Sequence, residues 1–115
     1  MPRSAKCRRV CAEFESKAFC PQSGIDEYIT VNVDELEAMR LCDFEGLEQE
    51  EAAVRMHISR GTFQRILYSG RKKTATALCK GFGIIIEGGN YEVANTHCKR
   101  NPPCASCCYE APTDA

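Results

Sequence analysis

The chain has 115 residues, 43% of them hydrophobic and 27% charged, and a formal net charge of −1. This is the composition of one globular domain with a single core, and it excludes disorder over the whole length. No apolar stretch approaches the roughly 20 residues that span a bilayer, and no run of signal-peptide length follows the basic start, so we expect no membrane insertion and a cytoplasmic location.

The first 25 residues are basic and contain chain breakers such as Pro21 and Gly24. They show neither the period of a strand nor that of a helix, so we interpret residues 1–25 as an irregular N-terminal arm. Residues 28–31, with the sequence Tyr-Ile-Thr-Val, come next. Their β-branched and aromatic side chains favour a short strand.

A first helix is predicted over residues 33–44. Asn32 and Glu35 have the spacing of a capping box, in which each side chain satisfies the backbone N–H of the other residue. The apolar residues that follow recur at helical spacing on one side, so we expect Glu35, Glu37 and Arg40 to face outward. The pattern ends at a glycine, which is a natural helix stop.

Two further helices are predicted, over about 48–56 and from 59 to about 78, with a short turn between them. Ala53 supplies a small side chain where two steeply crossing backbones would approach. Larger apolar residues such as Phe63 recur at the interval that returns to the same core. These features predict a helix-turn-helix at residues 49–68.

Residues 82–86 read as a strand that ends at a Gly-Gly-Asn turn, and we expect this strand to pair with residues 28–31. The expected fold is mainly α, with a helix-turn-helix core of three helices, a short two-stranded β element and irregular cysteine-containing termini. The predicted organisation is a basic arm at 1–25, a DNA-binding domain at 26–95 and a cysteine-rich tail at 96–115.

The charges are segregated along the chain. Residues 26–51 contain ten acids and one base, whereas residues 52–86 contain seven bases and no acid. A polyanion is therefore expected to favour the second segment. Arginine binds guanine and glutamine binds adenine through paired hydrogen bonds, so outward residues at the start of the third helix have the chemistry to read base edges.

The residues expected to read bases are Ser59, Arg60, Gly61, Gln64 and Arg65. Those expected to contact phosphates are Arg8, Arg9, Gln49, Thr62, Arg71, Lys72 and Lys73. His57 is interpreted as a turn residue near phosphate. The alternatives that the sequence leaves open are an inert pair of packed basic helices and an RNA-binding or protein-binding surface.

Nine cysteines in a reducing compartment indicate metal binding or redox chemistry rather than disulfides. The candidate ligands of zinc or of an iron–sulfur cluster are His97, Cys98, Cys104, Cys107 and Cys108 in the tail, with Cys7, Cys11 and Cys20 in the arm. A redox-active thiol tail, and cysteines without a role, remain open. Cys42 and Cys79 lie within predicted helices and are expected to be packed core thiols.

Several motifs resemble those of a known family. They are Met-Pro-Arg at 1–3, Cys-Arg-Arg-Val-Cys at 7–11, the helix at 35–41, Asp-Phe-Glu-Gly-Leu at 43–47, Gln-Glu-Glu-Ala-Ala at 49–53, Ser-Arg at 59–60 and Ile-Glu-Gly-Gly-Asn-Tyr at 86–91. Over residues 1–92 the chain resembles the prokaryotic domain of unknown function 134, also called uncharacterised protein family 0251. The resemblance implies DNA binding, a helix-turn-helix similar to region 4 of sigma factors, and a link to metal metabolism.

Three residues depart from the pattern of that family. Glu48 stands where the family usually has serine, so the second helix lacks a good N-cap, a difference of ~1 kcal/mol. His57 stands where glycine is usual, and Gly61 where proline is usual, beside the residues expected to read bases. These departures bear on stability and target sequence rather than on the fold.

Together these observations predict a sequence-specific DNA-binding transcription regulator, not an enzyme, that is modulated by a metal or by the redox state of its cysteines. The alternative is a metal-binding or iron–sulfur accessory or redox protein whose helices dock a protein partner. The expected partners are double-stranded DNA and a second copy of the chain, with RNA polymerase as a further candidate.

Overall fold

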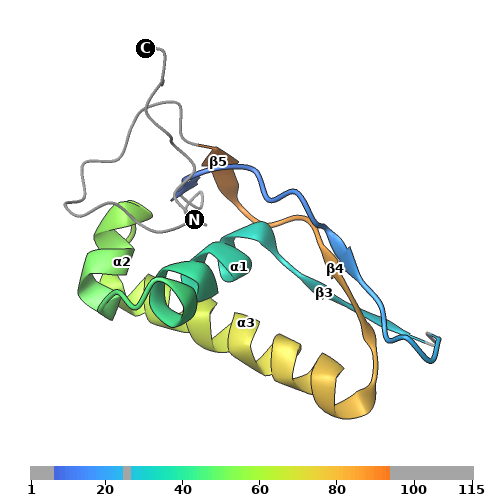
Figure 1. Cartoon of the computed structure of the whole chain (residues 1–115). Helices are drawn as coiled ribbons and strands as arrows, with labels where there is room; N and C mark the ends of the chain where they lie inside the picture. The colour runs from blue at the N-terminus through green and yellow to red at the C-terminus, as the bar shows by residue number, and fades with distance from the viewer. Residues whose placement is uncertain (1–6, 25–26, 94–115) are drawn as a thin grey trace, which may run out of the picture.

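The computed structural model describes residues 7–24 and 27–93. In chain order the elements are β1 (Arg8–Val10), β2 (Ala18–Phe19), β3 (Tyr28–Val31), α1 (Val33–Met39), the π-helical turn η1 (Arg40–Phe44), α2 (Gln49–Arg55), α3 (Arg60–Lys80), β4 (Gly83–Ile86) and β5 (Tyr91–Val93). The three helices group on one side of the molecule, and the long strands β3 and β4 run together on the other (Figure 1).

The first predicted helix forms, but its second half is π-helical. Glu35 accepts a hydrogen bond from the backbone N–H of Asn32 at 2.9 Å, as the capping box predicts. The chain then widens into η1, where the N–H of Glu45 donates to the carbonyl of Arg40 at 2.8 Å. The sequence did not predict this π turn. Insertions of this kind are frequent at functional positions because they redirect the side chains that follow.

The other two helices also form where the sequence predicts them. Ser59 caps α3, because its hydroxyl accepts a hydrogen bond from the N–H of Thr62 at 3.2 Å. The helix then runs to Lys80, slightly beyond the predicted end. Gly81 stops it with a left-handed backbone at φ +74°, a conformation that glycine adopts without strain.

Two small sheets replace the single two-stranded element that the sequence predicted. The expected pairing of β3 with β4 is confirmed and is parallel, but β2 joins the other edge of β4 in antiparallel orientation. A second sheet pairs β1 with β5 in parallel. Within the described residues, the N-terminal arm is therefore not wholly irregular, because residues 8–10 and 18–19 form strands. Strands of two or three residues carry no readable period, and the partner of β1 lies at the far end of the described chain.

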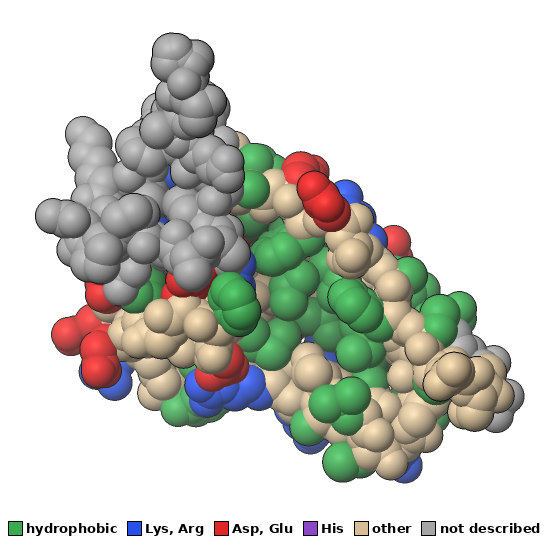
Figure 2. All heavy atoms as spheres, in the orientation of Figure 1, with side chains coloured by type: hydrophobic (Ala, Val, Ile, Leu, Met, Phe, Trp, Pro, Cys, Tyr) green, Lys and Arg blue, Asp and Glu red, His purple; other side chains and the backbone are tan. Residues whose placement is uncertain are grey.

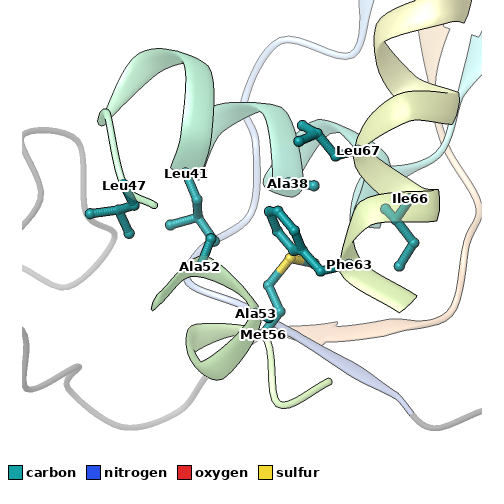
Figure 3. Close-up of a cluster of buried hydrophobic side chains, with 9 residues drawn as sticks. All are labelled: Ala38, Leu41, Leu47, Ala52, Ala53, Met56, Phe63, Ile66 and Leu67. Atoms are coloured by element: carbon teal, nitrogen blue, oxygen red, sulfur yellow. The ribbon is translucent and has the colours of Figure 1, made fainter. Parts of the chain in front are cut away.

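Two clusters of apolar side chains form the core. The helical cluster consists of Ala38, Leu41, Leu47, Ala52, Ala53, Met56, Phe63, Ile66 and Leu67. Figure 3 shows Met56 and Phe63 pointing toward each other between α2 and α3. The second cluster joins the strands to the start of α1 and consists of Val10, Val31, Val33 and Ile86. Met39 packs against both clusters, so the helices and the sheets share one interior.

The inward positions predicted for α2 and α3 are confirmed, since Ala53 and Phe63 are both buried. Burial of a large apolar side chain such as Phe63 contributes about 1.5–3 kcal/mol to stability. Among the helices of the described residues, none combines the length and apolar character needed to cross a membrane.

The acidic residues of α1 differ from the expectation. Glu35 and Glu37 were expected to face outward, and this is wrong, because they are 6% and 1% exposed. Glu35 accepts hydrogen bonds from Ser69 at 2.6 Å and from Lys73 at 3.0 Å, both on α3. Buried carboxylates persist when they are paired in this way.

Arg40 was also expected to face outward, but its side chain is only 10% exposed. Its guanidinium donates to Glu37 at 2.8 Å and to Glu45 at 3.2 Å, and the backbone N–H of Cys11 donates to the Glu37 carboxylate at 3.2 Å. These bonds connect the N-terminal segment to α1. The partners lie far apart in sequence or on a turn that was not predicted, so the helical pattern of α1 gave no sign of the burial.

Candidate nucleic-acid interface

A tight connection at residues 56–59 joins α2 to α3. His57 occupies it with a left-handed backbone at φ +62°, the one non-glycine residue of the described chain in that region. The N–H of Ile58 donates to the carbonyl of Ala53 at 3.1 Å, which folds the turn back on α2. As a result, the two helices run in clearly different directions and do not merge into one rod (Figure 1).

The five residues predicted to read bases lie together on the first turns of α3. Ser59, Arg60, Gly61 and Arg65 are exposed, and Gln64 is half-buried. The core takes the opposite face of this segment through Phe63, Ile66 and Leu67. A projecting segment with two arginines, an amide and a hydroxyl has the donors and acceptors that base edges and phosphates require.

Two of these side chains are held in place by local hydrogen bonds. Arg65 donates to the hydroxyl of Thr62 at 3.2 Å, and Gln64 donates to the hydroxyl of Tyr68 at 3.3 Å. Side chains fixed in this way lose less conformational entropy when they bind. Thr62, predicted as a phosphate contact, thus lies between the cap residue Ser59 and Arg65.

Tyr68 is a further exposed residue of this surface, and it was not among the residues predicted to contact DNA. It is 50% exposed, one helical turn beyond Gln64 on the same side of α3. The guanidinium of Arg71 lies 5.8 Å from the centre of its ring, within the range of a cation–π contact. Its spacing of four residues from Gln64 is the signal that could have identified it.

The three basic residues at 71–73 have different surroundings. Lys72 is exposed, and Arg71 forms an ion pair with Asp43 at 2.7 Å on the surface. The hydrogen bond that Arg71 donates to Asp43 raises the pKa of this arginine. Lys73 points inward to the buried Glu35 and is only about a third exposed. Its charge is thus engaged within the fold.

Strand β1 brings the N-terminal arginines close to the turn between α2 and α3. The N–H of Arg9 donates to the carbonyl of Met56 at 3.0 Å, and its guanidinium lies 3.3 Å from the sulfur of Cys11. Arg8 is 3.7 Å from the carboxylate of Asp34. The structure therefore brings the arm and the turn together, although they are far apart in sequence.

The carboxyl group of Asp34 is nearly enclosed, at 6% exposure. Burial raises its pKa above the ordinary value, and the charge of Arg8 only partly offsets this effect. Its Oδ1 accepts the backbone N–H of Glu35 at 2.9 Å. Gly89 approaches so closely that a side chain there would meet this oxygen at 2.6 Å. The group thus fixes the loop after β4 against α1.

Gln49, the other predicted phosphate contact, opens α2. It is half-buried, and within the described residues its side-chain oxygen is buried without a hydrogen-bond partner. The exposed Glu48, Glu50 and Glu51 surround it. This part of α2 therefore presents negative charge to the solvent.

The cysteines that the structure describes do not gather. Cys7 and Cys20 are exposed and Cys11 is buried, and no group of three or more potential ligands that could hold a metal ion occurs in residues 7–24 and 27–93. The tail candidates lie outside the described residues. They are His97, Cys98, Cys104, Cys107 and Cys108.

The two helical cysteines also differ from each other. Cys42 is half-buried against the helical core, and this burial raises the pKa of its thiol. Cys79 was expected to be a packed core thiol, and this is wrong, because it is exposed. It follows the buried Ala77 on the last turn of α3, where it projects from the opposite side.

Comparison with known proteins gives one family. A family model described as "Protein of unknown function DUF134" matches residues 1–94. A UPF0251 protein of Caldicellulosiruptor saccharolyticus is 53% identical over 91 residues, which is 79% of this chain and 66% of the relative. The UPF0251 protein cbdbA217 of Dehalococcoides mccartyi is 46% identical over 110 residues, which is 90% of this chain and 93% of the relative. No solved structure matches the chain.

Proposed function

This chain belongs to the DUF134 family of proteins of unknown function, and we propose that it is a sequence-specific DNA-binding transcription regulator. In this proposal α2, the turn at His57 and α3 act as a helix-turn-helix, with the start of α3 in the major groove. The observation that carries the proposal is the exposed, acid-free segment from Ser59 to Arg65, which projects from a buried anchor at Phe63.

The dimensions of the major groove support this docking. It is about 12 Å wide and admits one α-helix, whose first turns reach the base edges. Arg60 and Arg65 supply paired donors for guanine, and Gln64 supplies the amide that matches adenine. Gly61 leaves the backbone open, since a Cβ added there would have the Arg65 guanidinium, 4.0 Å away, as its nearest neighbour.

The charge pattern selects among the phosphate candidates. Glu48, Glu50 and Glu51 repel phosphates from the first turn of α2, which argues against Gln49 as a contact. The proposal therefore assigns phosphate contacts to Thr62 and Lys72, whereas Arg71 stays paired with Asp43.

The test is the affinity for a fluorescent random-sequence duplex, followed by anisotropy across a series of salt concentrations. The logarithm of affinity should fall linearly with the logarithm of salt, by about 0.9 for each phosphate neutralised. Selection of tight binders from a random duplex pool then yields the specific site. On that site Arg65→Gln and Arg60→Gln should each cost about 1–3 kcal/mol.

Lys80→Gln is the matched control, because it removes the same charge from the same helix at an exposed position. Lys80 lies 15 residues beyond Arg65, about 23 Å along the helix axis, and is out of reach of the same groove. A salt-independent affinity, or an equal loss from Lys80→Gln and Arg65→Gln, would contradict the proposal.

A further inference from the structure

An apolar groove of about 570 Å³ opens between the N-terminal segment, the helices and β4. Figure 2 shows hydrophobic side chains gathered in this hollow, on the side of the molecule where the strands face the helices. The principal apolar residues that line it are Phe14, Phe19, Leu36, Met39, Phe44 and Ile84. Together with Thr74 of α3, the lining residues come from four separate parts of the chain, so no stretch of sequence displays the groove.

Two phenylalanines stand at the rim with most of their surface in water. Phe44, at the end of η1, is 67% exposed, and Phe19, on β2, is 52% exposed. Single exposed apolar residues are ordinary on protein surfaces, but two aromatic rings beside an apolar hollow form a contiguous patch. Such patches mark places where another apolar surface docks.

Three polar side chains of the lining are engaged with other groups, whereas Glu15 and Ser16 are exposed, which bears on the kind of occupant. Arg40 is bound by Glu37 and Glu45. Asp43 is paired with Arg71, and the hydroxyl of Thr74 donates to the sulfur of Met39 at 3.6 Å. A small polar ligand would find few groups to orient it, whereas an apolar protein surface can cover these pairs without breaking them.

We propose that this groove is the surface through which two copies of the chain associate. A symmetric dimer requires one patch that is complementary to itself, so the patch must carry both a projection and a hollow. This patch carries both, and Phe44 of each copy would enter the groove of the other. Near the groove Lys17 and Glu13 form an exposed ion pair at 3.6 Å, and Glu15 lines the groove, so the surface of each copy carries both signs of charge.

The available area agrees with this assignment. The exposed parts of the four phenylalanines in a symmetric pair amount to about 500 Å² of aromatic surface. That is enough for the apolar centre of a standard interface, which buries about 1,600 Å² in total. Thr74, which lines the groove, lies 14 residues beyond Arg60, about 21 Å along α3. Association here leaves the start of α3 exposed in both copies, and it does not depend on DNA binding.

The experiment is sedimentation equilibrium of the full chain without DNA, in the presence of a reductant so that intermolecular disulfides do not contribute. The wild-type protein should show a reversible equilibrium between monomer and dimer. Phe44→Glu should weaken it about 1,000-fold, because an aromatic anchor contributes about 30-fold and is lost twice in a symmetric pair. Phe19→Glu tests the second rim residue in the same way.

Val54→Glu is the control, since Val54 is 71% exposed on α2 and does not line the groove. It should leave the equilibrium unchanged, and circular dichroism of all three variants should match the wild type. A monomer at about 1 mM, where even a millimolar complex is substantially formed, would overturn the proposal. A dimer that persists in both phenylalanine variants would also overturn it. The same holds for a monomeric protein that binds an apolar dye in the groove, if Phe44→Glu abolishes the binding of the dye.

Discussion

Helix α3 crosses α1 at Gly70. The substitution Gly70→Ala adds one methyl group at this crossing, and its effect on stability tests how closely the two helices pack. A Cβ at Gly70 would lie 3.0 Å from the Cβ of Glu35 and 3.2 Å from its carbonyl oxygen. Carbon atoms in favourable contact are about 3.5–4.0 Å apart, so one helix must move by a few tenths of an ångström. Glu35 resists this movement because Ser69 and Lys73 hold its carboxylate.

The two opposing effects of Gly70→Ala can be compared. Overpacking costs about 1–3 kcal/mol, whereas alanine in place of glycine stabilises a helix interior by about 1 kcal/mol. We expect a net loss of about 1 kcal/mol in the free energy of unfolding. Gly61→Ala is the matched control on the same helix, because only the end of the flexible Arg65 side chain comes near, at 4.0 Å. It should gain about 0.5 kcal/mol.

Urea unfolding followed by far-ultraviolet circular dichroism, under reducing conditions, measures both variants. If the free energy of unfolding falls with urea concentration at the same slope in both variants, their midpoint concentrations can be compared directly. For a domain of this size a change of 1 kcal/mol also moves the melting temperature by about 4–8 °C, which is easily resolved. If Gly70→Ala stabilised the protein as much as Gly61→Ala, the helices would not be in contact at this position, and the reasoning would fail.

Three further predictions concern the buried acids and the loop that covers them. Gly89→Ala and Gly24→Ala place alanine at similar positive φ angles, +99° and +109°, but only alanine at position 89 meets a neighbour, Asp34 Oδ1 at 2.6 Å. In thermal unfolding, Gly89→Ala should therefore lose about 1–3 kcal/mol more stability than Gly24→Ala. Equal losses in the two variants would refute the contact. Burial raises the pKa of Asp34, so the folded state keeps the carboxyl proton to higher pH than the unfolded chain does. The contribution of Asp34 to stability is therefore greatest below the ordinary pKa of aspartate, and it declines as pH rises through the pKa of the folded state. Asp34→Asn should therefore gain stability relative to the wild type from acid to neutral pH in urea titrations, and the opposite trend would contradict this reasoning. Glu35→Gln should lower the free energy of unfolding by about 1–3 kcal/mol, since it leaves the charge of Lys73 without its partner, and an unchanged urea midpoint would show that this pair does not stabilise the fold.

The helices could be predicted from the sequence because their signals are local. Asn32 and Glu35 begin α1, Ser59 begins α3, and Gly81 ends it, each within a few residues of the turn that it satisfies. The pairing of β3 with β4 was also predicted, because both strands carry runs of β-branched residues. The outward face at the first turns of α3 follows in the same way from the spacing of its apolar residues.

The remaining features depend on partners that are distant in sequence. Strand β1 is ordered by β5 and by the backbone of Met56, and a three-residue segment shows no pattern of its own. Glu35 and Glu37 look like solvent-facing residues of an amphipathic helix. Their burial depends in part on partners far away in sequence, Lys73 for Glu35 and the backbone N–H of Cys11 for Glu37. The apolar groove is likewise assembled from four segments.

The central claim is that the start of α3 meets the edges of bases. Titration of isotope-labelled protein with its selected duplex, followed by the amide resonances of the protein, tests this claim residue by residue. The largest, saturable shifts should fall on residues 59–65, with a smaller shift at Lys72 and none at Lys80. Shifts confined to the groove around Phe44, or no shifts at residues 59–65 at saturating DNA, would contradict the account.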